Sequence, residues 1–253
     1  MMAETVSRPG GLERWVKRLS GVLLLVPAIV LAVTFFSAFH HATADKAFWE
    51  TDEFYFFCLG GVVWMLCFFG SIWACGEPRP LRLYVFGHEL THAVWVWALG
   101  GSVRQFEVRR QGGFIVTTKN NFWIALAPYF YPLYSMAVIV IYALASLFYD
   151  VAQAGAVSIF GTPLQWFFLA LGLTWAFHIS FTCWMLPKGQ SDITAHGTFF
   201  SLVLIYLMNL LTIALFLIVA APEVTFLSFG RELWGNAEHF ARLVLRAVGA
   251  LHG

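Results

Sequence analysis

A series of long apolar blocks constrains this chain more than any other feature of its sequence. The blocks are roughly residues 19–39, 55–76, 83–100, 122–149, 163–186 and 193–221. A helix that crosses the hydrocarbon core of a bilayer needs about 20 mostly apolar residues. The blocks have this length, and they lack the alternating pattern of barrel strands. Because backbone groups in hydrocarbon must be satisfied within their own segment, we expect six transmembrane helices.

The composition agrees with this expectation. Of the 253 residues, 60% are hydrophobic and 11% are charged, with a mean hydropathy of +0.74, whereas soluble domains contain about 25% charged residues. The formal net charge of +1 gives no indication of a nucleic-acid partner. The four cysteines form no CxxC pair, so neither a disulfide framework nor Cys-ligated zinc is expected. The first block is longer than the apolar part of a signal peptide, and we expect a retained helix there.

Two further elements are predicted outside the apolar blocks. Between Val103 and Thr118, two β-prone runs flank Gly112-Gly113, which indicates a hairpin with a Gly-Gly turn. From Ser228 to Leu251, charged and apolar residues are interspersed, which indicates an amphipathic helix, either at a membrane surface or packed on the loops.

The predicted fold is therefore an all-α polytopic membrane protein. It has about six transmembrane helices, a short β-hairpin between the third and fourth, and a C-terminal amphipathic helix. We expect residues 1–76 to form the N-terminal and accessory helices, residues 77–221 a membrane core, and residues 222–253 the amphipathic helix.

The third block carries the residues with the clearest chemistry, Gly87-His88-Glu89-Leu90-Thr91-His92. Residues four apart share a helix face, so His88 and His92 can hold one metal ion with Glu89 beside it. With eight histidines in the chain, an HExxH pattern is expected by chance only about 0.01 times. Ionisable groups in an apolar span cost about 2.5–3.5 kcal/mol each and normally mark a function. The alternative is a hydrogen-bonded polar cluster that joins helices.

The metal expected at this motif is zinc with three protein ligands, which leaves a position for water. Glu89 is then the group that takes the proton of the zinc-bound water and passes it to a leaving amine. Asp192 is the best third ligand among the four aspartates, because it begins the last block directly after the helix-breaking segment 187–191. Alternatively, Asp192 only caps a helix near Lys188.

Two histidines compete with Asp192 for the third position. His178 and His196 are candidates either as ligands or as groups that orient a ligand. Asp192 also faces a difficulty of depth, because counting the spans places the beginnings of the third and last blocks on opposite sides of the membrane. For Asp192 to reach the histidines, the break at 187–191 must enter the protein interior.

With these residues, the chain resembles the site-2 protease family of intramembrane metalloproteases over about residues 80–220. Its HExxH motif is followed, after an apolar segment, by Pro187 and then Asp192, which is the spacing around that family's third ligand. Trp184 stands where the family has Asn, and Ile193 where it has Gly. Ala127-Pro128 is similar to the start of the family's second core helix, and the hairpin occupies the same place between core helices.

The resemblance implies an intramembrane zinc metalloprotease that hydrolyses a peptide bond in or near a substrate transmembrane helix. Its partners would be a membrane-anchored protein substrate and the lipid bilayer, with a membrane partner protein or a homo-oligomer as further candidates and no nucleic acid. The implied location is a bacterial inner membrane. An exposed hairpin edge could bind an unwound substrate segment by strand addition, although an ordinary basic surface hairpin is an equal alternative.

Two other functions remain open at this point. The departures at Trp184 and Ile193 keep open the alternative of a catalytically inactive, zincin-like membrane scaffold subunit of a larger complex. A transporter would require broken helices paired between two halves of the chain, and the sequence shows no internal repeat of that kind.

Overall fold

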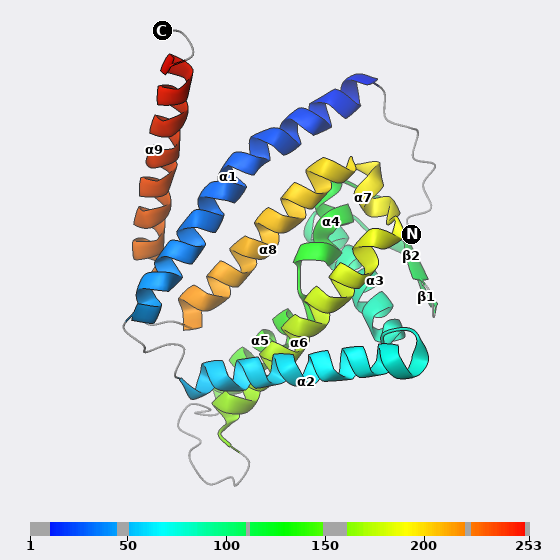
Figure 1. The fold of residues 1–253 in the computed structure, drawn as a ribbon. Coiled ribbons are helices and arrows are strands. Elements are labelled where there is room, and N and C mark those ends of the chain that lie inside the picture. The colour runs from blue at the N-terminus through cyan, green and yellow to red at the C-terminus, as the bar shows by residue number, and fades with distance from the viewer. Residues whose placement is uncertain (1–10, 45–50, 110–111, 149–160, 221–223, 251–253) are drawn as a thin grey trace. The chain divides into compact units, whose positions relative to one another are not determined.

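The structure is a computed structural model that describes residues 11–44, 51–109, 112–148, 161–220 and 224–250 (Figure 1). Contacts divide the chain into two compact units. The first unit contains the described residues between 51 and 195, and the second contains residues 11–44 and the described residues between 196 and 250. This division groups the first helix of the chain with the last two, whereas the sequence suggested three consecutive parts.

The first unit contains most of the secondary structure. Its elements are α2 (Asp52–Cys75), α3 (Leu81–Ala98), β1 (Val103–Arg109), β2 (Gly112–Thr117), α4 (Phe122–Phe130), α5 (Leu133–Phe148), α6 (Pro163–Met185), the 3-10 helix η1 (Leu186–Lys188) and α7 (Ser191–Ala195). The second unit contains α1 (Gly11–Ala44), α8 (Thr198–Ala220) and α9 (Phe226–Ala250). Each predicted apolar block is therefore helical, and so is the predicted C-terminal segment.

Polar side chains define where several of these helices begin. The Thr51 hydroxyl accepts a hydrogen bond from the Phe54 amide at the start of α2, at 3.2 Å, and the Asn121 side chain does the same for Ile124 in α4, at 2.9 Å. Thr162 and Gln165 form a reciprocal capping box at the start of α6. These bonds satisfy amide groups that have no partner within the first turn of a helix.

Four helices in the described part of the chain are long and apolar enough to cross a membrane. They cover Gly11–His40, Asp52–Cys75, Pro163–Lys188 and Thr198–Phe216, and the bent pair α4 and α5 would make a fifth span. Helix α3 does not meet this criterion, because Arg82 and the HExxH residues interrupt its apolar sequence. The predicted count of six spans is thus reproduced only in part.

Two predicted helices are broken in the structure. Block 122–149 consists of α4 and α5, which meet at an angle of 75°. Tyr131 is extended (φ −101°, ψ 103°) because it precedes Pro132, which disfavours helical backbone in the residue before it. The last block divides into α7 and α8 at Gly197, whose φ of 87° lies in the left-handed region that glycine adopts readily.

The predicted hairpin is present as an antiparallel pair of strands. Val108 is opposite Gly113, and Arg109 is opposite Gly112. Gly112 and Gly113 therefore lie within β2, so the prediction that they form the turn was wrong. The connection itself, residues 110–111, lies outside the described residues.

Helices α2 and α6 approach each other closely. A Cβ atom at Gly60 of α2 would overlap the carbonyl oxygen of Leu169, and one at Gly172 of α6 would overlap that of Phe57. Small residues at such a crossing allow two backbones to come into contact, as is common between membrane helices. The glycine pair thus determines how closely these two helices pack.

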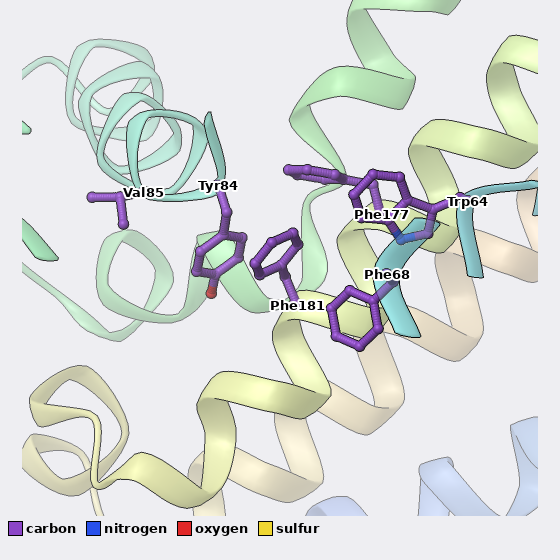
Figure 2. Packing of buried hydrophobic residues seen from close by; sticks show 6 residues of the cluster. All are labelled: Trp64, Phe68, Tyr84, Val85, Phe177 and Phe181. Carbon is purple, nitrogen blue, oxygen red and sulfur yellow. The ribbon is translucent and has the colours of Figure 1, made fainter. Parts of the chain in front are cut away.

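An aromatic cluster connects α3 to this helix pair (Figure 2). It consists of Trp64 and Phe68 on α2, Tyr84 and Val85 on α3, and Phe177 and Phe181 on α6. The rings of Tyr84 and Phe181 are stacked, with centroids 4.7 Å apart and planes at 10°. Because Tyr84 lies one helical turn before His88, this cluster helps to determine where the HExxH residues lie.

In the second unit, α1 contacts both α8 and α9. The Asn236 amide of α9 donates a hydrogen bond to the Thr34 hydroxyl of α1 at 3.1 Å, and the Ser37 hydroxyl donates to Glu232. Phe229 and Phe39 pack nearby, with ring centroids 6.2 Å apart. One face of α9 is therefore occupied by α1, while apolar side chains such as Trp234 and Leu245 are exposed.

Candidate metal centre

Helix α3 brings His88 and His92 together one turn apart, with ring centroids separated by 4.9 Å. The Oδ2 atom of Asp192 lies 3.4 Å from Nε2 of His88 and 3.6 Å from Nε2 of His92. One ligand atom from each of these side chains lies within 4.8 Å of the others, which makes this a group that could hold a metal ion. The structure thus brings together the three residues that the sequence predicted as ligands.

The segment after α6 explains how Asp192 reaches the histidines. The chain continues from α6 into η1, and Gly189 then adopts a left-handed conformation (φ 72°, ψ 49°) that allows a sharp turn without a steric penalty. Asp192, in the first turn of α7, is buried. The break at 187–191 therefore carries a carboxylate into the interior of the unit, as the sequence reasoning required.

The two spacings between Asp192 and the histidines fit a tetrahedral metal ion. Zinc lies about 2.0–2.2 Å from nitrogen and oxygen ligands, so two ligand atoms of a tetrahedral site are about 3.3–3.5 Å apart. The two His–Asp distances are 3.4 and 3.6 Å, longer than the usual range of about 2.7–3.2 Å for N–H···O hydrogen bonds. Two imidazole nitrogens and one carboxylate oxygen are a donor set that zinc accepts, with a fourth position left for water.

The electrostatic surroundings favour an ionised Asp192, which lies outside the four candidate spans. Burial opposes ionisation of the carboxyl, but the adjacent imidazoles of His88 and His92 outweigh burial and lower its pKa. An ionised carboxylate is the form that binds a metal ion.

Helix α4 supplies a polar contact to two of the three residues. Nδ1 of His92 lies 2.8 Å from the carbonyl oxygen of Ile124. Because a carbonyl only accepts, Nδ1 carries a proton, and in the neutral imidazole Nε2 is the nitrogen left with a lone pair for a metal ion. The Tyr129 hydroxyl donates to Oδ2 of Asp192 at 3.2 Å. Sequence reasoning identified neither contact, since a backbone carbonyl has no sequence signal and Tyr129 lies within an otherwise apolar block.

Glu89 is buried, with 3% of its surface exposed, and it lies against the hairpin. A Cβ atom at Gly113 would come within 2.6 Å of Glu89 Cγ and 2.9 Å of its Oε1. A cavity of about 320 Å³ lies beside Glu89, His88 and Asp192, between Gly112-Gly113 of the hairpin and the segment 188–191. A carboxylate next to two imidazoles on a cavity is an arrangement suited to proton transfer.

The other candidates from the sequence lie elsewhere. His178 is buried on α6, with its ring centroid 6.1 Å from that of Trp175, and His196 belongs to the second unit. Neither residue is part of the group that could hold a metal among the described residues. At the position of the family's Asn, the Trp184 ring has the Lys188 ammonium 4.6 Å from its centroid, and Ile193 is buried.

Comparison with known proteins gives no independent identification. No protein-family model matches the chain, and neither the curated proteins nor the solved structures include a significant match.

Proposed function

We propose that this chain is a multi-pass membrane zinc metalloprotease similar to the site-2 proteases. It would hydrolyse a peptide bond in or next to a transmembrane helix of its substrate. The observation that carries the proposal is the meeting of His88, His92 and Asp192, together with a cavity that is lined by His88, Asp192 and the buried Glu89. Four ionisable groups gathered in an apolar chain, three of them buried and His88 partly buried, are costly, and such clusters normally serve a function.

Zinc bound at this site would supply Lewis acidity and lower the pKa of water to about 7. His88, His92 and Asp192 are the residues that would hold it. The contact between His92 Nδ1 and the Ile124 carbonyl fixes the tautomer of His92, so that Nε2 is available as a ligand. Glu89 accepts a proton from the attacking water and donates it to the leaving amine.

The geometry of the hairpin favours a peptide as the substrate. Strand β2 pairs with β1 along one edge, and Gly112 and Gly113 of β2 line the cavity. An extended substrate segment could pair with the remaining edge of β2 and pass Glu89. Because a helical backbone has no free amide and carbonyl groups to offer, the substrate helix has to unwind locally before it binds.

The exposed surface of the helices supports a bilayer location. On α2, the side chains of Leu66, Phe69 and Trp73 are 70%, 59% and 90% exposed. Such a concentration of exposed apolar surface is unfavourable in water and favourable in lipid. The chain would then meet its membrane-anchored substrate within the same bilayer. The same holds for a membrane partner protein or a second copy of the chain.

The test uses full-length protein purified in detergent, with zinc measured by elemental analysis. The protein is incubated with casein and with a tagged single-span membrane protein as probes for cleavage. We expect about one zinc per chain, and we expect Glu89→Gln to abolish cleavage while zinc content is retained. Loss of zinc in both His88→Ala and Asp192→Ala would establish the ligand set, whereas zinc retained without Asp192 would refute the third ligand.

A second candidate function is an inactive zincin-like scaffold subunit. The observation in its favour is the Trp184 and Lys188 pair, which stands where the family has a substrate-binding Asn. An inactive scaffold predicts that Glu89→Gln changes neither the biological function nor the assembly, whereas a protease predicts normal assembly and lost cleavage. The same variant therefore separates the two functions.

A further inference from the structure

We propose that Tyr129 is a positioning residue that holds the Oδ2 oxygen of Asp192 in place for the metal ion. This inference rests on the proposed metal centre and adds a residue to it that sequence reasoning did not identify. It concerns the hydroxyl group of Tyr129, which donates to the same oxygen that lies nearest the two histidines.

The geometry places Tyr129 between two of the three ligands. Its side chain is 0% exposed, and its hydroxyl lies 3.2 Å from Oδ2 of Asp192. Its ring stands edge to face with the His88 ring, with centroids 5.2 Å apart and planes at 83°. The phenol thus packs against one ligand while it donates to another.

A hydrogen-bond donor of this kind keeps a carboxylate in one orientation. Asp192 has two oxygens that exchange places when the terminal torsion rotates, and that torsion is soft. A single donor aimed at Oδ2 favours one rotational state, with the result that less freedom is lost when an ion binds. Asp192 comes from a short helix that follows a turn, so its backbone alone restrains it less than α3 restrains the two histidines.

The packing of α4 makes Tyr129 a rigid donor. Seven of the nine residues of α4 are buried, among them Ile124, whose carbonyl contacts His92. The same helix therefore orients His92 through a backbone oxygen and Asp192 through a side-chain hydroxyl. A buried tyrosine hydroxyl normally has a hydrogen-bond partner, and here that partner is a proposed ligand.

The test measures zinc affinity by competition with a chromophoric chelator, using full-length protein in detergent. All variants carry Glu89→Gln, so that proteolysis does not affect the measurement. We expect Tyr129→Phe to weaken zinc binding by about 10- to 100-fold, the usual effect of losing a group that orients a ligand. Tyr134→Phe is the matched control, because the Tyr134 hydroxyl donates to the Leu83 carbonyl, at 2.6 Å, and not to Asp192. If the two variants bind zinc equally well, the proposal is overturned.

A double substitution separates positioning from general stability. If Tyr129 acts by holding Oδ2 of Asp192, then Tyr129→Phe has a smaller effect on zinc affinity in an Asp192→Glu background, where a carboxylate ligand is kept but its oxygens are moved away from the Tyr129 hydroxyl. An equal loss in both backgrounds would mean that Tyr129 serves only the packing of α4, and it would overturn the inference. Thermal unfolding without zinc monitors folding of each variant.

The outcomes also distinguish this inference from the proposed function. A wild-type protein that binds no zinc overturns both proposals. Zinc binding that depends on Tyr129, together with cleavage that persists in Glu89→Gln, overturns the proposed catalytic role and supports the positioning role.

Discussion

Glu89 occupies the space that any side chain at position 113 would need. A Cβ atom on Gly113 would lie 2.6 Å from Glu89 Cγ and 2.7 Å from the Glu107 carbonyl oxygen. The strand is therefore in direct contact with the residue that we propose as the proton acceptor. A glycine within a strand often marks such a close approach.

We expect Gly113→Ala to reduce cleavage strongly, because the methyl group pushes Glu89 or the strand away from its position. A misplacement of about 1 Å can cost about 100-fold in rate. Zinc content should remain near one per chain, because the atoms nearest to a Cβ at Gly113 belong to Glu89 and Glu107 and not to the three proposed ligands. The measurement is the cleavage rate of the tagged single-span probe beside elemental zinc analysis.

Gly70→Ala is the control for this substitution, since a Cβ at Gly70 meets nothing within 4 Å. Cleavage by the Gly113→Ala variant at the control's rate would contradict the contact between hairpin and Glu89.

At the scale of residues, the sequence predicted the parts of the site that depend on local spacing. His88, Glu89 and His92 follow from the period of a helix. Asp192 follows from its place after a helix-breaking segment. Tyr129 and the Ile124 carbonyl were not predictable, because their roles arise only when α4 packs beside α3 and α7, and nothing in a single sequence encodes that contact.

Among the elements, the crossing of α2 and α6 depends on two glycines without room for a side chain. Gly60 and Gly172 each face a carbonyl oxygen of the opposite helix. Because two rigid backbones are in contact there, an added side chain cannot be accommodated by a change of rotamer and must separate the helices.

We expect Gly60→Val to destabilise the first unit by about 1–3 kcal/mol or more, as overpacking does. Gly70→Val, on the same helix but in open space, is the matched control and should change stability far less. Thermal unfolding in detergent measures both. Equal unfolding temperatures for the two variants would show that the close crossing is absent.

The aromatic cluster makes a separate contribution to stability. Phe181 is fully buried, and its ring lies 4.7–6.1 Å from the rings of Tyr84, Phe177, Phe68 and Trp64. We expect Phe181→Ala to lower the free energy of unfolding by about 3–5 kcal/mol, and Phe181→Leu to lower it less, because leucine fills part of the space. Thermal unfolding of the two variants beside wild type provides the comparison, and an undisturbed Phe181→Ala variant would contradict the packing.

Helices and strands with a strong local sequence signal were predictable. The positions at which they bend or break were harder to predict. Every apolar block is helical, and the hairpin and the C-terminal helix are present. The bend at Tyr131 is caused by Pro132, which follows it. The sequence predicted one continuous helix here because the apolar block is long enough to cross a membrane. The composition of Gly112-Gly113 indicated a turn. In the structure both residues lie within β2, where the lack of a side chain at Gly113 allows the strand to lie against Glu89.

For the whole molecule, the composition of the sequence predicted apolar helices that could cross a membrane, but it did not predict which helices pack together. The structure places α1 with α8 and α9 in one unit and the remaining elements in the other. Such groupings depend on contacts between segments far apart in the chain. Apolar blocks of similar composition carry little information about which of them pack together.

The native cysteines test the proposed bilayer location. Cys67 lies in the middle of α2 and Cys75 at its end, and both side chains are exposed. In single-cysteine variants reconstituted into vesicles, a water-soluble maleimide on both sides should label Cys75 and leave Cys67 unlabelled, because lipid covers the middle of a span. Both should react after denaturation. Equal labelling rates in the intact vesicles would argue against a bilayer around α2.

The two imidazoles of the site differ in their access to the outside. The His88 side chain is 9% exposed and the His92 side chain 2%, and the cavity borders His88, Glu89 and Asp192 but not His92. Access to the proposed centre would therefore be from one side, and His88 would be the first nitrogen that an arriving ion meets and the last that it leaves. Compact chelators should extract such an ion quickly, while bulky ones have to wait for it to dissociate.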